Sequence, residues 1–334
     1  MKNWLIGIFL AVLTLIAIAL AGLFLQKSFF SDEVADKNIT KIIKKTSELN
    51  DTNSSNTTTR LETSILEVKR SKYSIATEIE DYENSKKMVF DKNITKKVEI
   101  KSTCKIKKVV KKVHKKRFND GISRLAIIMD DIGNRSQVNA LKEIPFPVTP
   151  SIFPSTKSHP HTPSFAKEFE FYMVHTPMQA FNFKREEEDT LNVTDSLSSI
   201  DKKIKIIHKD FPKAIAINNH TGSKFTSSSK AMDRLFCALD KYNMRFIDSK
   251  TAAHTYGSKM GELHGKVVYN RDTFLDNKPD IDYILGQIKK AIKTAKKRGL
   301  AIAICHPRPE TFQALKEAEY LFGDVKLIYV DELY

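Results

Sequence analysis

The chain is 334 residues long, with 41% hydrophobic and 28% charged residues and a formal net charge of +15 at pH 7. This length is enough for one large domain or two ordinary ones. Its three cysteines, Cys104, Cys237 and Cys305, form neither an even framework nor a CxxC pair. The sequence therefore argues against a disulfide scaffold and against a zinc site built from cysteines.

The first predicted element is an apolar run, in which no charged residue lies between Trp4 and Leu25. About 20 apolar residues suffice to cross a bilayer as a helix, whereas the apolar part of a signal peptide usually has roughly 7–15 residues. No small-residue cleavage site follows, so we predict an uncleaved anchor over residues 1–26, with a cleaved signal peptide as the alternative. Lys2 favours an N-terminus on the inside. We therefore expect a single-pass protein of the inner (cytoplasmic) membrane, with its C-terminal domain on the periplasmic side.

Residues 27–122 are rich in Lys, Ser, Thr, Asn, Asp and Glu and poor in the apolar residues that a core requires. We predict a polar and basic spacer that is largely disordered. Within it, the run from Lys101 to Arg117 holds nine Lys or Arg and no acidic residue. No aromatic side chains are interleaved for stacking on bases, so we expect no nucleic-acid partner. Beside a membrane this run suits anionic lipid or an anionic wall polymer, and a solvated charge run without a partner explains it equally well.

From residue 123 to residue 334, short apolar runs alternate with helical patterns, which is typical of an α/β domain. The predicted strands cover residues 125–129, 148–153, 169–174, 214–218, 244–247, 266–269, 300–305 and 326–330. A long amphipathic helix is predicted to end at Arg298, with Gly299 as its C-cap. About eight strands with crossovers in some 210 residues predict a barrel-like fold, and an open doubly wound sheet is the alternative.

Polar side chains stand at the carboxyl ends of most predicted strands. They are Asp130 and Asp131, His175, the run Asn218-Asn219-His220, Asp248, the run Asn270-Arg271-Asp272, and His306. A lone Asp after a strand is usually a helix N-cap, and a lone His is usually a satisfied polar residue. In a parallel α/β barrel, however, these strand ends converge on the face where chemistry is done. Capping does not explain Asp and His at five separate strand ends.

Acids and histidines that share one face suit a hydrolytic metal centre. Such a centre typically has three nitrogen or oxygen ligands and one position left open for water. The metal lowers the pKa of that water, a carboxylate outside the ligand set acts as base, and a histidine protonates the leaving group. The sequence has no HExxH, GxGxxG or GxSxG motif and no Walker loop, which disfavours the mechanisms that those motifs support.

Six segments of the predicted domain together resemble the divergent polysaccharide deacetylase family, relatives of the metal-dependent polysaccharide deacetylases. They are AIIMDDIG, HTPM, INNHTGSKFT, FIDSKT, RDTFLDN and AICHPRPET, in this order over roughly residues 125–315. The resemblance implies a distorted (β/α) barrel, which agrees with the predicted strands. It does not extend to the residues upstream.

The resemblance also implies roles for individual residues. In the polysaccharide deacetylases the first Asp of an Asp-Asp pair is the base and the second binds the metal, which points to Asp130 and Asp131 respectively. Their metal motif carries two His four residues apart, but here His220 is followed at that spacing by Lys224. We expect His175 to replace the missing ligand. Asp131, His175 and His220 would then hold a divalent metal, with zinc as the expected ion.

His306 is the counterpart of the histidine that protonates the departing amine. Asn219, Asp248, Arg271 and Arg308 are expected to hold or orient groups around the site. These assignments predict a membrane-anchored hydrolase that removes N-acetyl groups from a polysaccharide or cell-wall glycan, acting on a C–N bond.

The alternative function is that of a catalytically inactive protein that binds polysaccharide or scaffolds the envelope. The Asp130–Asp131 pair and His306 favour the enzyme, because binding alone needs no acid and base. Lys224 favours the binding protein, since the loss of a ligand shifts the metal or abolishes catalysis.

Overall fold

The computed structural model describes residues 102–104, 115–116, 118 and 120–334. The predicted anchor over residues 1–26 lies outside the described residues, and so does most of the predicted spacer. Among the residues that the structure describes, no helix combines the length and the apolar character needed to span a membrane.

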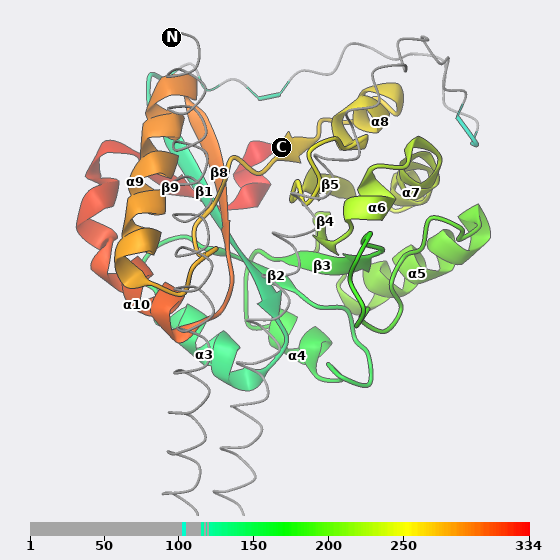
Figure 1. The fold of residues 1–334 in the computed structure, drawn as a ribbon, viewed down its shortest axis with the longest axis horizontal. Coiled ribbons are helices and arrows are strands. Elements are labelled where there is room, and N and C mark those ends of the chain that lie inside the picture. The colour runs from blue at the N-terminus through cyan, green and yellow to red at the C-terminus, as the bar shows by residue number, and fades with distance from the viewer. Residues whose placement is uncertain (1–101, 105–114, 117, 119) are drawn as a thin grey trace, which may run out of the picture. The chain divides into compact units, whose positions relative to one another are not determined.

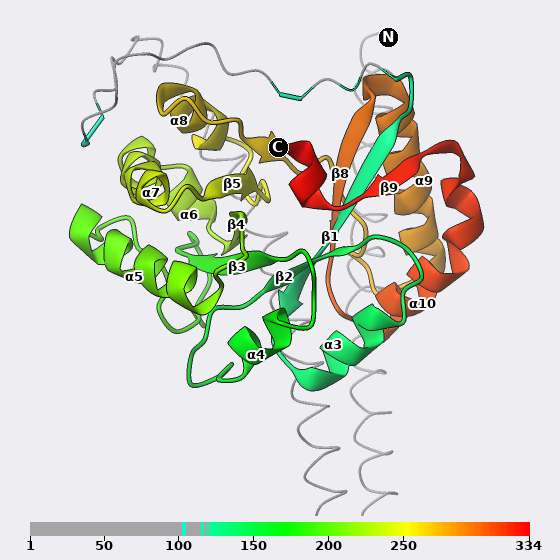
Figure 2. The ribbon, with the colours of Figure 1, turned by 180° about the vertical axis from the view of Figure 1, so that it is seen from behind.

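The centre of the fold is a parallel sheet that curls into a half-barrel (Figures 1 and 2). In the described part of the chain eight strands follow the order β6-β5-β4-β3-β2-β1-β8-β7, and a ninth strand, β9, pairs with β1. Their bounds are β1 (Arg124–Ile132), β2 (Thr149–Ile152), β3 (Met173–Met178), β4 (Ala216–Thr221), β5 (Arg245–Asp248), β6 (Tyr269–Asn270), β7 (Thr273–Phe274), β8 (Leu300–Cys305) and β9 (Lys326–Ile328). Because all strands run in the same direction, their carboxyl ends meet at one end of the half-barrel.

The helices surround the outside of the sheet, with α9 and α10 beside β8 and with α5 and α7 beside β3 and β4 (Figure 2). Their bounds are α3 (Arg135–Lys142), α4 (Thr162–Ala166), α5 (Leu197–Asp210), α6 (Ser223–Thr226), α7 (Ser229–Lys241), α8 (Gly257–Leu263), α9 (Ile281–Arg298) and α10 (Pro309–Glu317), followed by the 3₁₀ helices η1 (Glu319–Asp324) and η2 (Val330–Leu333). The α-helices pack on one face of the sheet only. The open doubly wound alternative, which has helices on both faces, is therefore wrong.

The long helix α9 forms for the reasons that its sequence suggests. The Asp280 side chain accepts a hydrogen bond from the backbone N–H of Tyr283 and so caps the first turn. The buried residues along its inner face are Ile284, Ile288, Ala291, Ile292 and Ala295. Gly299 ends the helix at φ 81°, in the left-handed region that glycine adopts without steric cost. The predicted C-cap is confirmed.

Alternate residues of the strands point into the half-barrel and form an apolar floor. This inner cluster includes Ala126, Ile128, Met173, Ala216, Ile247, Ile302 and Ile304. Their chain neighbours, such as Ile127 and Val174, pack outward against the helices. Because side chains alternate along a strand, the positions that follow the floor also point inward. Those positions are polar: Asp130, His175, Asn218 and His306.

Two strands lie further along the chain than predicted. The third runs over β3 instead of residues 169–174, and the fourth runs over β4 instead of residues 214–218. The predicted bounds followed the strongest apolar runs, whereas the true strands continue through the polar residues that face the barrel end. The two-residue strand β7 was not predicted, because it is too short to show a period.

One disulfide joins Cys104 to Cys237 of α7, across 133 residues of sequence, and Cys305 is free and buried in β8. The sequence had argued against a disulfide scaffold from the odd number of cysteines. That count gave no indication of a single long-range pair, because pairing depends on the fold and not on spacing.

Candidate metal centre

The two adjacent carboxylates at the end of β1 both face the site, which a regular strand does not permit. Successive side chains of a strand point to opposite faces, so Asp131 would face the helices if Asp130 faces the interior. The register with β2 shifts between Met129 and Ile132, and Asp131 has φ 58°. This irregularity turns the Asp131 side chain inward, as bulges next to functional sites often do.

His175 of β3 and His220 of β4 converge on the carboxylate of Asp131. The Oδ1 atom of Asp131 lies 3.2 Å from Nε2 of His175 and 3.1 Å from Nδ1 of His220. The two ring nitrogens are themselves 3.2 Å apart. These three atoms therefore form a nearly equilateral triangle, and the residues form a group that could hold a metal ion.

The residues of this triangle fit a divalent ion. Oδ1 of Asp131 is buried and accepts no aligned hydrogen bond, although both nitrogens are within hydrogen-bond distance of it. Distance alone does not make a hydrogen bond, because a ring N–H that points away from the oxygen does not satisfy it. The ligand atoms are 3.1–3.2 Å apart. Such separations are compatible with atoms that bind one ion at bonds of roughly 2.0–2.2 Å. The donors, two nitrogens and one oxygen, are those of catalytic zinc sites.

Asn218 connects this triangle to the second carboxylate. Its Oδ1 accepts a hydrogen bond from Oγ of Ser151 at 2.6 Å and lies 3.0 Å from Nδ1 of His175. Its Nδ2 donates to Oδ1 of Asp130 at 2.8 Å. Since Oδ1 of Asn218 can only accept, Nδ1 of His175 carries the proton. In the neutral imidazole the lone pair of Nε2 then points toward the triangle, as it must in a metal ligand.

The two carboxylates differ in their electrostatic environment. Burial raises the pKa of Asp130, and the opposing effects of His175, His306 and Asn218 do not cancel it. Burial alone would also raise the pKa of Asp131, but His220 and His175 outweigh it and hold that pKa well below the ordinary value. Carboxylates whose pKa values are pushed apart take different roles in acid–base chemistry.

His306 follows β8, and the pairing of Met129 with Cys305 places it beside Asp130. Its Nδ1 lies 2.9 Å from Oδ1 of Asp276, and its backbone N–H donates to Oδ2 of the same residue at 2.7 Å. The sequence prediction missed Asp276. The feature of the sequence that could have indicated Asp276 is the second acidic residue of RDTFLDN, which comes after the two-residue strand β7.

Three of the predicted supporting residues stabilise the loops around the centre. Asn219 accepts a hydrogen bond from the backbone N–H of Ser249 at 3.0 Å and so joins β4 to the loop after β5. Arg271 donates from Nε to the carbonyl of Ser249 at 2.7 Å. Arg308 donates from Nη1 to the carbonyl of Asp276 at 2.9 Å and so fixes the segment that holds His306.

Asp248 lies at the end of β5 but makes local contacts. Its carboxylate accepts hydrogen bonds from Oγ1 of Thr255 at 2.5 Å and from the backbone N–H of Lys250 at 2.8 Å. It organises the turn that leads to α8. Asp248 is absent from the groups of described residues that can share an ion. Lys224 lies on α6, where its backbone N–H donates to the carbonyl of Gln179.

An aromatic wall borders the two histidines. The ring of Phe153 lies 5.5 Å from that of His175 and 5.0 Å from that of His220, and Phe183 lies 6.3 Å from His220. The ring of His159 stacks on the ring of Phe153, with the two centroids 4.7 Å apart. These aromatic residues were not predicted, because apolar residues in a loop resemble core residues in sequence.

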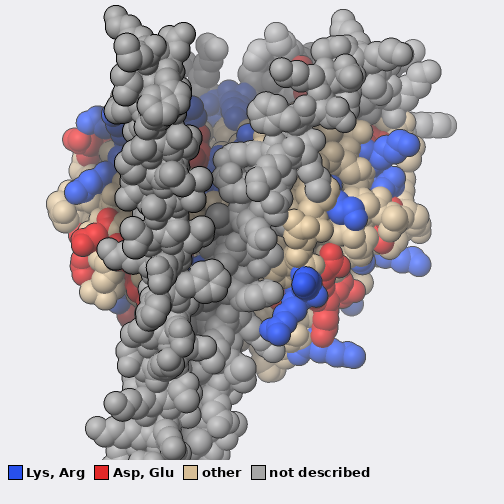
Figure 3. Space-filling view, viewed as in Figure 1, with Lys and Arg blue, Asp and Glu red and all other residues tan. Residues whose placement is uncertain are grey.

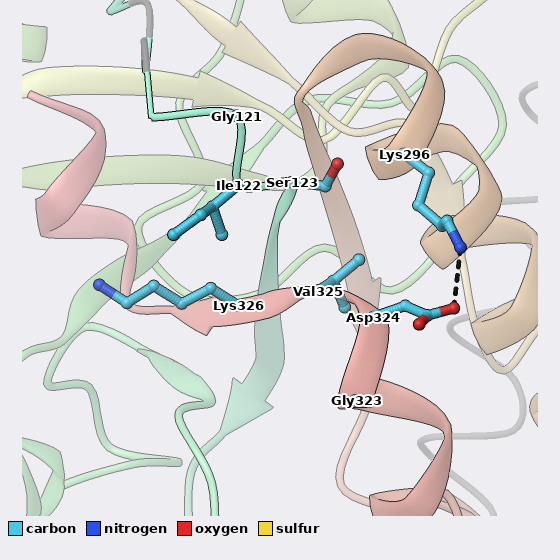
Figure 4. Close-up of a pocket in the computed structure, with 8 residues that line it drawn as sticks. All are labelled: Gly121, Ile122, Ser123, Lys296, Gly323, Asp324, Val325 and Lys326. Carbon is cyan, nitrogen blue, oxygen red and sulfur yellow. Dashed lines mark hydrogen bonds and ion pairs between the residues drawn. The ribbon is translucent and has the colours of Figure 1, made fainter.

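A pocket at the opposite end of β1 has a different character. It is lined by Gly121, Ile122, Ser123, Lys296, Gly323, Asp324, Val325 and Lys326 (Figure 4). Nζ of Lys296 and Oδ2 of Asp324 form an ion pair of 2.8 Å across it. On the face of the domain in Figure 3, basic and acidic side chains are interspersed over the described residues. The polar groups suited to chemistry gather at the carboxyl ends of the strands, as in other parallel barrels.

The domain is similar to known proteins. The family model described as divergent polysaccharide deacetylase matches residues 127–334. The uncharacterized protein YibQ of Escherichia coli is 32% identical over 216 residues, which is 63% of this chain and 67% of that protein. An uncharacterized protein of Haemophilus influenzae is 28% identical over 220 residues, which is 65% of this chain and 79% of that one.

A solved structure supports the fold. The uncharacterized protein ATU2773 of Agrobacterium tumefaciens has a TM-score of 0.58 at 18% sequence identity. The similarity covers 66% of this chain and 92% of that structure. At this identity the similarity establishes the arrangement of strands and helices only.

Proposed function

The chain belongs to the divergent polysaccharide deacetylase family, and we propose that it is a metal-dependent enzyme that removes N-acetyl groups from a polysaccharide. The observation that carries the proposal is the triangle of Asp131, His175 and His220, whose ligand atoms are 3.1–3.2 Å apart. The buried Oδ1 of Asp131 lacks an aligned donor, and an ion would satisfy it. In a purely structural cluster this buried oxygen would be expected to accept a hydrogen bond.

The ion would be held by Asp131, His175 and His220, and their nitrogen and oxygen donors favour zinc. When bound, a divalent ion lowers the pKa of a water molecule and polarises the scissile carbonyl. In this proposal His175 serves in place of the second motif histidine, at whose position in the sequence Lys224 stands. Asp131, His175 and His220 would then supply three protein ligands.

The chain's own residues supply the acid and the base. Asp130 has a raised pKa and is fixed by Asn218, so it is suited to accept the proton of the attacking water. His306 is held by Asp276 and would donate a proton to the departing amine. The carboxylate of Asp276 stabilises the protonated imidazole and sets its orientation.

The substrate class follows from the family and from the walls of the site. The family acts on glycans, and Phe153 and Phe183 form an apolar wall beside the metal ligands. Such a wall suits the methyl group and ring face of an N-acetylated sugar. A polysaccharide or cell-wall glycan with N-acetyl groups is therefore the proposed substrate.

We also propose that this domain, residues 123–334, is tethered outside the cytoplasmic membrane by residues 1–26 through the spacer 27–122. The proposal rests on the uncharged apolar run between Trp4 and Leu25. The basic run from Lys101 to Arg117 would contact anionic lipid or wall polymer. Full-length protein should fractionate with membranes and keep its N-terminus. A soluble form that starts near residue 27 would show a cleaved signal peptide instead.

The second candidate is a glycan-binding protein without turnover. Lys224 favours it, because it replaces a motif histidine. In that case the centre would bind sugar but release no acetate.

Acetate release from N-acetylglucosamine oligomers by the purified full-length chain distinguishes the two candidates. We expect release with zinc, loss after chelation, and recovery when zinc is returned. Glycan binding without acetate release, by protein that carries its full complement of metal, would favour the second candidate and contradict the enzyme.

A further inference from the structure

A second group of ligand-type side chains comes from a short upstream segment, from α7 and from the residue that follows α8. The Sγ atoms of Cys104 and Cys237 and one ring nitrogen of His264 all lie within 4.8 Å of one another. In the structure the two sulfurs form a disulfide. We call these three residues, with Asp233 and Asp240 beside His264, the flank cluster.

The upstream segment is held by more than the disulfide. Asp233 accepts hydrogen bonds from Oγ of Ser102 at 2.7 Å, from the backbone N–H of Thr103 at 2.6 Å and from Oγ1 of Thr103 at 2.5 Å. The Asp233 residue is only 2% exposed, so these charge-assisted bonds are shielded from water. They would keep Cys104 next to Cys237 after the S–S bond is broken.

His264 lies between two carboxylates, one at each ring nitrogen. Its Nδ1 lies 2.9 Å from Oδ2 of Asp240, and its Nε2 lies 2.9 Å from Oδ1 of Asp233. Lys266 in turn pairs with Asp240 at 3.1 Å. A metal-bound histidine almost always donates its second ring N–H to a carboxylate, which fixes its tautomer. A disulfide by itself needs no buried imidazole between two carboxylates.

We propose that the flank cluster binds zinc, or a similar thiophilic divalent ion, when its disulfide is reduced. Cys104, Cys237 and His264 would be the ligands, and Asp240 would orient His264. Two sulfurs and one nitrogen, with water in the fourth position, form a recognised zinc site, and thiolates select zinc over harder cations. The disulfide and the metal site exclude each other, because both use the same sulfurs.

The redox step needs a dithiol reductant. One of its thiolates attacks a sulfur of the Cys104–Cys237 bond and forms a mixed disulfide, and its second thiol resolves this intermediate. The reductant leaves as its own disulfide, after giving two electrons and two protons to the protein sulfurs. Zinc then binds the two thiolates and releases their protons to solvent.

Cobalt(II) spectroscopy of the reduced full-length chain tests the proposal. A thiolate bound to cobalt gives a sulfur-to-metal charge-transfer absorption that the sulfur-free centre of Asp131, His175 and His220 cannot give. We expect this absorption to saturate at one cobalt per chain, to vanish when zinc is added, and to be absent from the oxidised protein. Absence from the reduced protein, or resistance of the folded protein's disulfide to a dithiol, would overturn the proposal.

Matched variants assign the ligands. Cys104→Ser should abolish the absorption, and because Cys104 lies outside α7 the variant should leave that helix intact. Cys305→Ser should keep the absorption, which shows that the third cysteine is not its source. Asp131→Asn should keep it as well, which shows that the strand-end centre is not its source. Asp240→Asn should weaken cobalt binding about 10–100-fold. An unchanged affinity in Asp240→Asn would show that Asp240 does not orient His264, and an absorption that survives in Cys104→Ser would contradict the proposed ligand set.

Discussion

The domain contains two buried groups of histidines and carboxylates, and their hydrogen bonding differs. At the strand ends, His175 and His220 share the single oxygen Oδ1 of Asp131, which accepts no aligned hydrogen bond. Between α7 and α8, one imidazole, that of His264, lies between two carboxylates that both contact its ring nitrogens. In the first group Oδ1 of Asp131 has no aligned donor, whereas in the second group both ring nitrogens of His264 are paired.

This difference separates a group that carries an energetic cost from one that carries none while its disulfide is intact. A buried acceptor without a donor costs about 1–3 kcal/mol, and Asp131 also adopts φ 58°, which is unfavourable for a residue with a side chain. Such costs persist where function needs the arrangement. The flank cluster shows no comparable cost, so removing one of its carboxylates should affect folding rather than catalysis.

Asp130→Asn should produce the largest change in activity. Asparagine keeps the shape and the contact with Asn218 but cannot accept a proton, so deacetylation should fall by about 10²–10⁴-fold. Acetate release measures the effect, and zinc content should stay the same as in the wild type. Equal loss of metal and activity would mean that Asp130 is a ligand and not the base.

Asp233→Ala should produce the largest change in stability. It removes one partner of a buried ion pair and leaves His264 and the upstream segment without their shared acceptor. We expect the free energy of unfolding to fall by about 3 kcal/mol, measured by urea denaturation with the disulfide intact. Asp201→Ala, which breaks the more exposed pair with Lys241, is the control and should cost less than about 1 kcal/mol. Similar losses in both variants would contradict the contrast between the two groups.

Asn218→Ala should weaken metal binding without removing a ligand. It takes away the acceptor that fixes the tautomer of His175, so zinc affinity should fall about 10–100-fold. Competition with a chelator measures the affinity. Asn270→Ala, which loses only contacts with Ser258, is the control and should bind zinc as the wild type does. An unaltered affinity in Asn218→Ala would mean that Asn218 does not position the ligand.

Lys250→Gly should have a small stabilising effect. Lys250 has φ 51°, which a side chain disfavours by about 1 kcal/mol, and glycine keeps its backbone hydrogen bonds. We expect a gain below about 1 kcal/mol, because glycine also increases the entropy of the unfolded chain. Lys259→Gly within α8 is the control and should lose about 1 kcal/mol. Destabilisation by both would show that the Lys250 side chain contributes contacts.

The sequence predicted the parallel α/β architecture because apolar runs and amphipathic helices depend on local periodicity. It also drew attention to the polar strand ends, since the alternation that buries Ile128 and Ile304 brings Asp130 and His306 inward two residues later. The inward turn of Asp131 was not predictable, because it results from a shift in pairing with β2.

Features that depend on distant contacts escaped prediction. Asp276 follows a strand of two residues, and the Cys104–Cys237 pair spans 133 residues. The role of Asn218 of β4 as a link between Asp130 of β1 and His175 of β3 also requires these strands to converge although β2 lies between β1 and β3. Such relations are set by the tertiary fold and leave no period in the sequence.

The central claim is that His175 completes a metal centre with Asp131 and His220. The most direct test is the zinc content of the full-length chain, purified with the Cys104–Cys237 disulfide intact so that only this centre is counted. We predict about one zinc per chain in the wild type and none in either His175→Ala or His220→Ala, because a site with three protein ligands does not hold zinc after losing one. Zinc retained in His175→Ala, or absent from the folded wild type, would contradict the account.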